Sequence, residues 1–290
     1  MKLQLVKIQP GFRALALSAA VLLTLGSSVL AADAPESWVR LDVPFVPTPP
    51  IVMEAMLKAA SVGANDVLYD LGSGDGRIAI AAARAYGVKK AVGIDLNPKR
   101  VAEAEANAKV AGVADRVSFI QGDVFKADFT AATVVTMYLL DNVNLRLRPR
   151  ILNELRPSTR IVSHQFHMFD WPPDNTVMVL DQVPVHFWVV PAKVQGSWHG
   201  KIGDDAVALD LAQKFQLVTG DLAVGDARGR IAQAKMTGDI LALEGSVTRS
   251  GKAEPLRFEG KVTKKALTGT LTLGGAAHSV ALQRAAESSR

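Results

Sequence analysis

Residues 67–77, with the sequence VLYDLGSGDGR, could bind a small charged ligand. The apolar run ends at a carboxylate, Asp70, and a turn of small residues follows it: Gly72, Ser73, Gly74 and Gly76. Glycine takes positive φ angles without strain and lets a ligand approach the backbone, while a helix beginning at the turn directs free N–H groups at that ligand. A carboxylate at this point repels a pyrophosphate. It suits a ligand that carries an ammonium or sulfonium group.

The spacing of these glycines argues against a dinucleotide. A pyrophosphate-binding fingerprint has the pattern G-x-G-x-x-G, which would need glycine where Arg77 stands. The observed pattern is D-x-G-x-G-x-G. An NAD-type oxidoreductase is therefore a disfavoured alternative.

Two further acids follow apolar runs downstream. Asp95 ends the second run, roughly 20 residues after the glycine turn, where an acid accepts hydrogen bonds from ribose hydroxyls. Asp123 follows the third run as part of Gly122-Asp123, which is also an ordinary turn pair. Together with Asp70, they predict a nucleoside-type ligand with a cationic group.

These motifs resemble motif I and its neighbours in the class I, seven-β-strand S-adenosylmethionine-dependent methyltransferases. Over about residues 43–190 the chain is similar to the protein lysine methyltransferases grouped with the mitochondrial ATP synthase c-subunit enzyme and its prokaryotic relatives. The resemblance implies that Asp70 reaches the methionine amino group and that Asp123 lies near the adenine amino group. It is carried by Thr48-Pro49-Pro50, residues 69–77, Gly93-Ile94-Asp95, Gly122-Asp123, Tyr138-Leu139-Leu140 and Ser163-His164.

Methyl transfer to an amine needs a neutral nitrogen held in line with the methyl carbon. A lysine amine, with an unperturbed pKa near 10.4, must lose a proton first. We expect candidate catalytic groups at the ends of the fourth and fifth strands: Tyr138, Asp141, His164 and, less directly, His167. Tyr138 would line the methyl channel, and either histidine could equally be structural. Relatives often have proline where Asp141 stands, so their substrate is not carried over at this position.

Alternating apolar runs and helical segments predict an α/β fold with a doubly wound, Rossmann-like seven-stranded methyltransferase sheet. The resemblance adds an antiparallel strand at its end. Thr48 is predicted to N-cap a helix with Pro49 and Pro50 in its first turn and an apolar stripe of Ile51, Met53, Met56 and Leu57. The expected strands span residues 66–70, 91–95, 117–121, 133–139, 160–165, 176–180 and 185–190, and the other helices span 77–86, 98–111 and 145–155.

Residues 192–290 differ in composition from the methyltransferase domain expected at 32–191. Glycine, a polar residue and an aliphatic residue recur every 7 to 20 positions, for example at Gly238-Asp239-Ile240 and Gly260-Lys261-Val262. This predicts an antiparallel meander that forms either an open sheet or a small barrel. Gly196-Ser197-Trp198 is similar to the start of lipocalin-like barrels. A structural role is favoured over ligand binding, because so few residues enclose little more than their own side chains.

Residues 1–31 have the layout of a signal peptide, with basic residues, an apolar run and small residues before Ala32. The prediction is an envelope protein, periplasmic or exported; an uncleaved membrane anchor is the alternative. S-adenosylmethionine is made in the cytoplasm, so export separates the protein from the supply of this cofactor. A non-catalytic protein that binds S-adenosylmethionine or a nucleotide is therefore an alternative.

The composition limits which partners and cofactors the protein could bind. The net charge of +5 is spread along the chain without a long basic run, which disfavours nucleic acid. The absence of cysteine excludes a disulfide and a zinc–thiolate site, and His164 and His167 without a third ligand predict no metal.

Trp171 is either a wall of the substrate entrance or a core residue. The leading interpretation is an S-adenosylmethionine-dependent N-methyltransferase acting on protein lysine.

Overall fold

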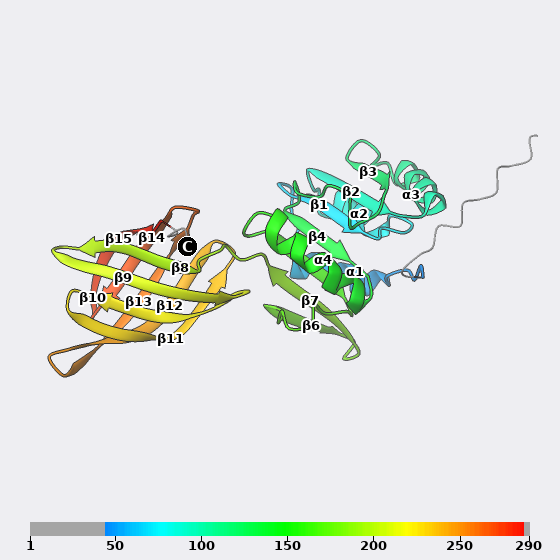
Figure 1. The fold of residues 1–290 in the computed structure, drawn as a ribbon. Helices are drawn as coiled ribbons and strands as arrows, with labels where there is room; N and C mark the ends of the chain where they lie inside the picture. Colours follow the sequence, from blue (N-terminus) through cyan, green and yellow to red (C-terminus); the bar gives the residue numbers. More distant parts are fainter. Residues whose placement is uncertain (1–43, 287–290) are drawn as a thin grey trace, which may run out of the picture. The chain divides into compact units, whose positions relative to one another are not determined.

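Two β-sheets follow one another along the chain in the computed structural model, which describes residues 44–286 (Figure 1). The predicted signal segment at 1–31 lies outside the described residues. Within 44–286, no helix combines the length and apolar character needed to cross a membrane.

The first sheet has seven strands in the order β3-β2-β1-β4-β5-β7-β6. The five strands β1 to β5 run parallel, whereas β7 runs antiparallel to β5 and forms a hairpin with β6. This is the expected methyltransferase topology. The strands are β1 (Val67–Leu71), β2 (Lys90–Asp95), β3 (Val117–Gln121), β4 (Val134–Met137), β5 (Arg160–His164), β6 (Asn175–Val179) and β7 (Val183–Val189).

Apolar side chains bury both faces of this sheet. The helices α1 (Pro50–Ala59), α2 (Arg77–Ala85) and α3 (Pro98–Val110) contribute to one cluster, for example through Met56, Ile78 and Ala104. On the other face α4 (Asp141–Glu154) packs Leu147 and Ile151 against strand residues such as Val135. The strands are therefore fixed between two layers, which holds the loops at their carboxyl ends in place.

Two local predictions at helices are wrong, and a third holds in part. Pro49, not Thr48, is the N-cap of α1, and no side chain caps this helix. Of the predicted apolar stripe, Met56 and Leu57 are buried and Met53 packs against the core, while Ile51 is exposed. Helix α4 begins at Asp141, four residues earlier than expected, so Asp141 lies in its first turn. A carboxylate there is favourable because it lies at the positive end of the helix dipole.

The second sheet is a closed antiparallel barrel of eight strands, which decides between the open sheet and the barrel expected from the sequence. Closure comes from β8, which pairs with both β9 and β15. The strands are β8 (Gly196–Ile202), β9 (Asp205–Lys214), β10 (Leu217–Val224), β11 (Ala227–Thr237), β12 (Ile240–Arg249), β13 (Lys252–Val262), β14 (Ala266–Leu273) and β15 (Ala276–Arg284).

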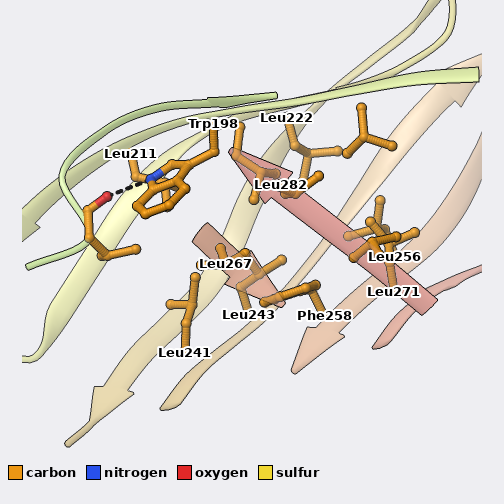
Figure 2. Close-up of a cluster of buried hydrophobic side chains, with 14 of the residues drawn as sticks. Trp198, Leu211, Leu222, Leu241, Leu243, Leu256, Phe258, Leu267, Leu271 and Leu282 are labelled. Atoms are coloured by element: carbon orange, nitrogen blue, oxygen red, sulfur yellow. Dashed lines mark hydrogen bonds between the residues drawn. The ribbon is translucent and has the colours of Figure 1, made fainter. Parts of the chain in front are cut away.

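Aliphatic side chains and two aromatic rings fill the barrel. Trp198 and Phe258 are fully buried among apolar side chains from all eight strands, most of them leucines and valines, and the Trp198 indole N–H donates to the Val194 carbonyl at 2.8 Å (Figure 2). The recurring glycines let strands approach closely: a Cβ on Gly269 would lie 2.1 Å from the Glu259 carbonyl oxygen. Small eight-stranded barrels are filled by their own side chains, and this one follows that rule.

Candidate functional site

A cavity lies at the carboxyl ends of β1, β2 and β4, where the strand order reverses between β1 and β4. Open α/β sheets bind ligands at this switch point, because the chain leaves neighbouring strands in opposite directions and a crevice remains. Residues from four segments of the chain line it: Pro44–Thr48, Asp70, Gly72, Ser73, Asp75, Arg77, Ile78, Asp95, Asn97, Arg100, Tyr138 and Leu139.

The glycine turn after β1 forms one wall of the cavity. Gly72, Gly74 and Gly76 all have positive φ angles, of 76°, 53° and 80°, as predicted. The turn is held against the end of β2, because the Gly72 N–H donates to the Ile94 carbonyl at 2.8 Å and the Gly74 N–H donates to Asp95 Oδ2 at 2.8 Å. Helix α2 begins at Arg77, directly after the turn.

Asp95 has hydrogen-bonding capacity left for a ligand. Its Oδ2 accepts from Gly74 N–H and its Oδ1 accepts from Asn97 N–H, each at 2.8 Å. A carboxylate oxygen has two acceptor sites, so one remains on each oxygen. Two hydroxyls on neighbouring carbons, as in ribose, match this arrangement.

Asp70 is a buried carboxylate facing the same cavity, with 2% of its surface exposed. Burial raises its pKa to about 7; the hydrogen bond from Thr136 Oγ1, at 2.8 Å, acts in the opposite direction, and the charges of Asp95 and Asp75 raise the pKa further. A carboxylate in such surroundings gains most from a cationic partner. The site therefore fits a ligand with an ammonium group beside Asp70.

Phe45 and Arg77 belong to the site and were not predicted as site residues. The Phe45 ring lies over the turn, where a Cβ on Gly74 would come within 2.3 Å of it, and the Arg100 guanidinium lies 3.9 Å from the ring centroid. Arg77 pairs with Asp75 and donates to the Thr48 carbonyl at 3.0 Å. The extended, proline-bracketed segment at 44–47 was the only sequence signal for this wall.

Tyr138 lines the cavity at the end of β4 and is backed by two other rings. Its ring centroid lies 3.7 Å from that of His164 and 5.9 Å from that of Phe166, in stacked orientations. His164 is buried, and its Nδ1 lies 3.2 Å from Thr48 Oγ1. Burial lowers the pKa of His164 to about 4, so its ring is neutral at physiological pH. His164 is thus placed to support Tyr138 rather than to accept a proton.

We expect His164→Phe to reduce the fall in the free energy of unfolding that the native sequence shows at acid pH, while keeping the aromatic stack. Between pH 6.5 and 4, histidine in the unfolded chain binds a proton that buried His164 does not, so the free energy of unfolding falls as pH falls. This loss should reach about 2 kcal/mol at pH 5 for the native sequence. Urea unfolding at pH 7 and pH 5 measures it. His199→Phe, at an exposed position, is the control, and an unchanged pH dependence in His164→Phe would contradict the expectation.

The remaining predicted residues lie apart from the cavity lining. Asp123 Oδ1 accepts from the Phe125 N–H at 2.9 Å, which is the turn geometry given as its alternative role. Asp141 Oδ1 accepts from the His167 backbone N–H at 2.9 Å and lies 3.0 Å from His167 Nδ1. Trp171 is fully buried and packs with Trp188 in the sheet core, so it is not a wall of the entrance. No group of three or more potential metal ligands occurs within residues 44–286.

Comparison with known proteins agrees with this geometry. Residues 70–175 match the family model of the ANTKMT methyltransferase domain. The chain is 50% identical over 139 residues to a protein-lysine N-methyltransferase of Saccharolobus islandicus, covering 48% of this chain and 86% of that protein. It is 34% identical over 134 residues to the adenine nucleotide translocase lysine N-methyltransferase of Mus musculus, covering 46% of this chain and 58% of that protein.

A solved structure gives the same result for the fold and its ligand. It is described as an RNA methyltransferase from Salinibacter ruber in complex with S-adenosyl-L-homocysteine, and it is 53% identical with a TM-score of 0.50. The match covers 51% of this chain and 96% of that one. The cofactor of this fold is S-adenosylmethionine, and the glycine turn, Asp70 and Asp95 fit its cationic and ribose groups. The chain therefore belongs to the class I S-adenosylmethionine-dependent methyltransferases, in the family that contains the Saccharolobus protein-lysine N-methyltransferase.

Proposed function

We propose that this protein transfers a methyl group from S-adenosylmethionine to the side-chain nitrogen of lysine in a protein. The observation that carries the proposal is the ring of Tyr138, which lines the cofactor cavity and stacks on the rings of His164 and Phe166. Aromatic faces attract ammonium groups and contact methylene chains, which are the two parts of a lysine side chain. The names of the Saccharolobus and mouse relatives support the same acceptor.

The residues of the cavity have separate roles in this proposal. Asp70 holds the amino group of the cofactor, and Asp95 accepts from its ribose hydroxyls. Phe45 and the neighbouring prolines cover the glycine turn and exclude water. When bound, the cofactor supplies a methyl group that is already activated by its sulfonium. The chain therefore has to position the amine in line and keep the reacting atoms dry.

Tyr138 orients the acceptor. Its ring is fixed from behind by His164, which the Thr48 hydroxyl holds in turn, so Tyr138 has little freedom to turn away from the cavity. A fixed wall reduces the number of orientations that a long, flexible lysine can take. This lowers the entropy cost of reaching the reactive geometry.

Transfer of labelled methyl groups tests the acceptor. Purified protein would be incubated with S-adenosylmethionine carrying a tritiated methyl group, with total cell protein in one arm and total RNA in a second, because one structural relative is described as an RNA methyltransferase. Acid hydrolysis and amino-acid analysis should recover the label as methyl-lysine. Label in RNA alone would overturn the lysine proposal. Binding of the cofactor without any labelled product would favour the non-catalytic binder.

We also propose that the mature protein lies in the cell envelope, periplasmic or exported. The support is the signal-peptide layout of residues 1–31. Fractionation of cells followed by N-terminal sequencing tests it, with Ala32 expected as the first residue. Recovery of the protein from the cytoplasm with Met1 retained would contradict it.

A further inference from the structure

We propose that helix α4 positions the methyl acceptor through Asp141 and Asn144, which hold the turn after β5 that keeps the Phe166 ring on Tyr138. The inference rests on the proposed lysine methyltransferase function and names positioning residues for its acceptor side. Asp141 and Asn144 lie outside the lining of the cofactor cavity. They act through Phe166, whose ring stacks on Tyr138, and Tyr138 lines the cavity.

The chain turns sharply at the end of β5. The Phe166 N–H donates to the His164 carbonyl at 2.8 Å, and Gln165 between them has a φ angle of 66°. A hydrogen bond between residues two apart, with a positive φ angle at the central residue, marks the rare and strained form of γ-turn. The rings on both sides of this turn reach Tyr138, since the centroids of His164 and Phe166 lie 3.7 and 5.9 Å from that of Tyr138.

The segment that carries Phe166 ends at a second left-handed residue. Phe169 has a φ angle of 55°, and neither it nor Gln165 is a glycine. A left-handed backbone is unfavourable for side chains of this size and persists only where the surrounding structure holds it. At the start of the segment the Gln165 N–H donates to the Pro184 carbonyl at 2.8 Å. The residues that follow are held by α4.

Two charged side chains of α4 bind the backbone of this segment. Asp141 Oδ1 accepts from the His167 N–H at 2.9 Å, and the Arg148 guanidinium donates to the Met168 carbonyl at 3.0 Å. Both hydrogen bonds involve a charged group, and such bonds are the stronger class. Asp141 and Arg148 are seven residues apart, which is about two helical turns, so their side chains lie on one side of α4.

Asn144 lies between these two on the same side of α4 and is fully buried. Its Nδ2 lies 3.3 and 3.4 Å from the carbonyl oxygens of Phe166 and His167, and 3.3 Å from Ser163 Oγ. The two carbonyl oxygens need a donor, which fixes the orientation of the amide. A buried carbonyl that loses its donor is unfavourable, so an apolar side chain at 144 would let this backbone move.

The role of Asp141 needs an acceptor oxygen and no change of its charge. Its Oδ1 also lies 3.0 Å from His167 Nδ1, but the Phe169 N–H donates to that nitrogen at 3.3 Å, so a neutral ring has no proton there for the carboxylate. The hydrogen bond to the His167 backbone N–H remains. Asparagine keeps an acceptor oxygen at this position and alanine does not, so the two substitutions separate positioning from acid–base chemistry.

The first test needs neither cofactor nor acceptor. ¹⁹F spectra of the full chain labelled with 3-fluorotyrosine contain three signals, and Tyr138→Phe assigns one of them. We expect this signal to shift in Asp141→Ala and Asn144→Leu in the same direction as in Phe166→Leu, because each change removes the Phe166 ring from Tyr138. Asp141→Asn should leave it in place. An unshifted Tyr138 signal in both Asp141→Ala and Asn144→Leu would overturn the proposal.

The second test measures methyl transfer to poly-L-lysine at saturating cofactor. We expect Asp141→Ala and Asn144→Leu to lower kcat/KM for the acceptor by at least about tenfold, the equivalent of one lost hydrogen bond. Asp141→Asn should stay within about twofold of the native rate, and cofactor affinity within about twofold in all three, because neither residue lines the cavity. Equal losses in Asp141→Asn and Asp141→Ala would assign the effect to the charge and overturn the positioning role.

Asn142→Ala is the matched control, because Asn142 is the exposed neighbour of Asp141 in the first turn of α4, and it should keep the native rate. The double variant Asp141→Ala with Phe166→Ala should be no slower than Phe166→Ala alone. Multiplied losses would overturn the route through Phe166. Failure of the native protein to label lysine at all would instead contradict the proposed function, and the fluorine spectra would still decide whether α4 holds the rings.

Discussion

Replacing Asp95 with alanine is expected to weaken S-adenosylmethionine binding by at least about 100-fold, since each hydrogen bond to a charged group contributes about 1.5–3 kcal/mol. The substitution removes the acceptors for two ligand hydroxyls together with the Gly74 N–H contact that shapes the turn. Titration calorimetry measures the affinity. Asp115→Ala, at an exposed acid, is the control. Native-like affinity in Asp95→Ala would exclude Asp95 from the cofactor site.

Gly74→Val should have a comparable effect on binding for a different reason. The Gly74 φ angle of 53° is strained for a β-branched residue, and an added Cβ would meet the Phe45 ring at 2.3 Å. Gly87→Val is a matched control, because Gly87 also has a positive φ, of 63°, but no atom would lie within 4 Å of its Cβ. Equal loss of affinity in the two variants would assign the effect to general backbone strain.

Asp70→Asn should raise the stability of the ligand-free protein and weaken cofactor binding. Between pH 3.8 and about 7 the folded protein keeps Asp70 protonated while the unfolded chain ionises it, so the free energy of unfolding falls as pH rises through this window. Asparagine has no such charge and can still accept from Thr136 Oγ1. We expect the ligand-free variant to be more stable than the native sequence at pH 8 by about 3 kcal/mol.

The same substitution should remove the pH dependence of cofactor binding. An ammonium group binds the ionised form of Asp70, so native affinity should be about tenfold higher at pH 7.5 than at pH 5.5, whereas Asp70→Asn should bind weakly at both. Calorimetry at the two pH values and urea unfolding at pH 8 give the two quantities. The expectation fails if native affinity is constant over this range or if the variant is destabilised at pH 8.

Much of the cofactor side of the site could be predicted from the sequence because its signals are local. The strand, the left-handed glycines and the start of α2 all lie within residues 67–77, and each follows from the backbone preferences of single residues. Asp95 could be placed from its position at the end of the next strand. Parallel strands bring their carboxyl ends to one edge, so chain order alone sets these two acids in the same cavity.

The acceptor side was decided by contacts between distant parts of the chain. His164 and His167 are equivalent in the sequence, three residues apart, yet one is buried against Thr48, 116 residues away, and the other is paired with Asp141 at the surface. Thr48 was expected to cap a helix, and its hydroxyl contacts His164 instead.

Contacts between distant parts of the chain also decided the positions of the aromatic residues and the closure of the barrel. Phe45 covers the glycine turn, and Trp171 packs inside the core, through neighbours that no local pattern identifies. The barrel closes because β8 pairs with β15, and strand pairing at that separation leaves no periodic signal. The sequence by itself thus determined the backbone of the cofactor turn and the class of ligand. Only the tertiary structure decided which side chains are buried, neutral or free to accept a proton, because desolvation and hydrogen bonding depend on neighbours brought together by folding.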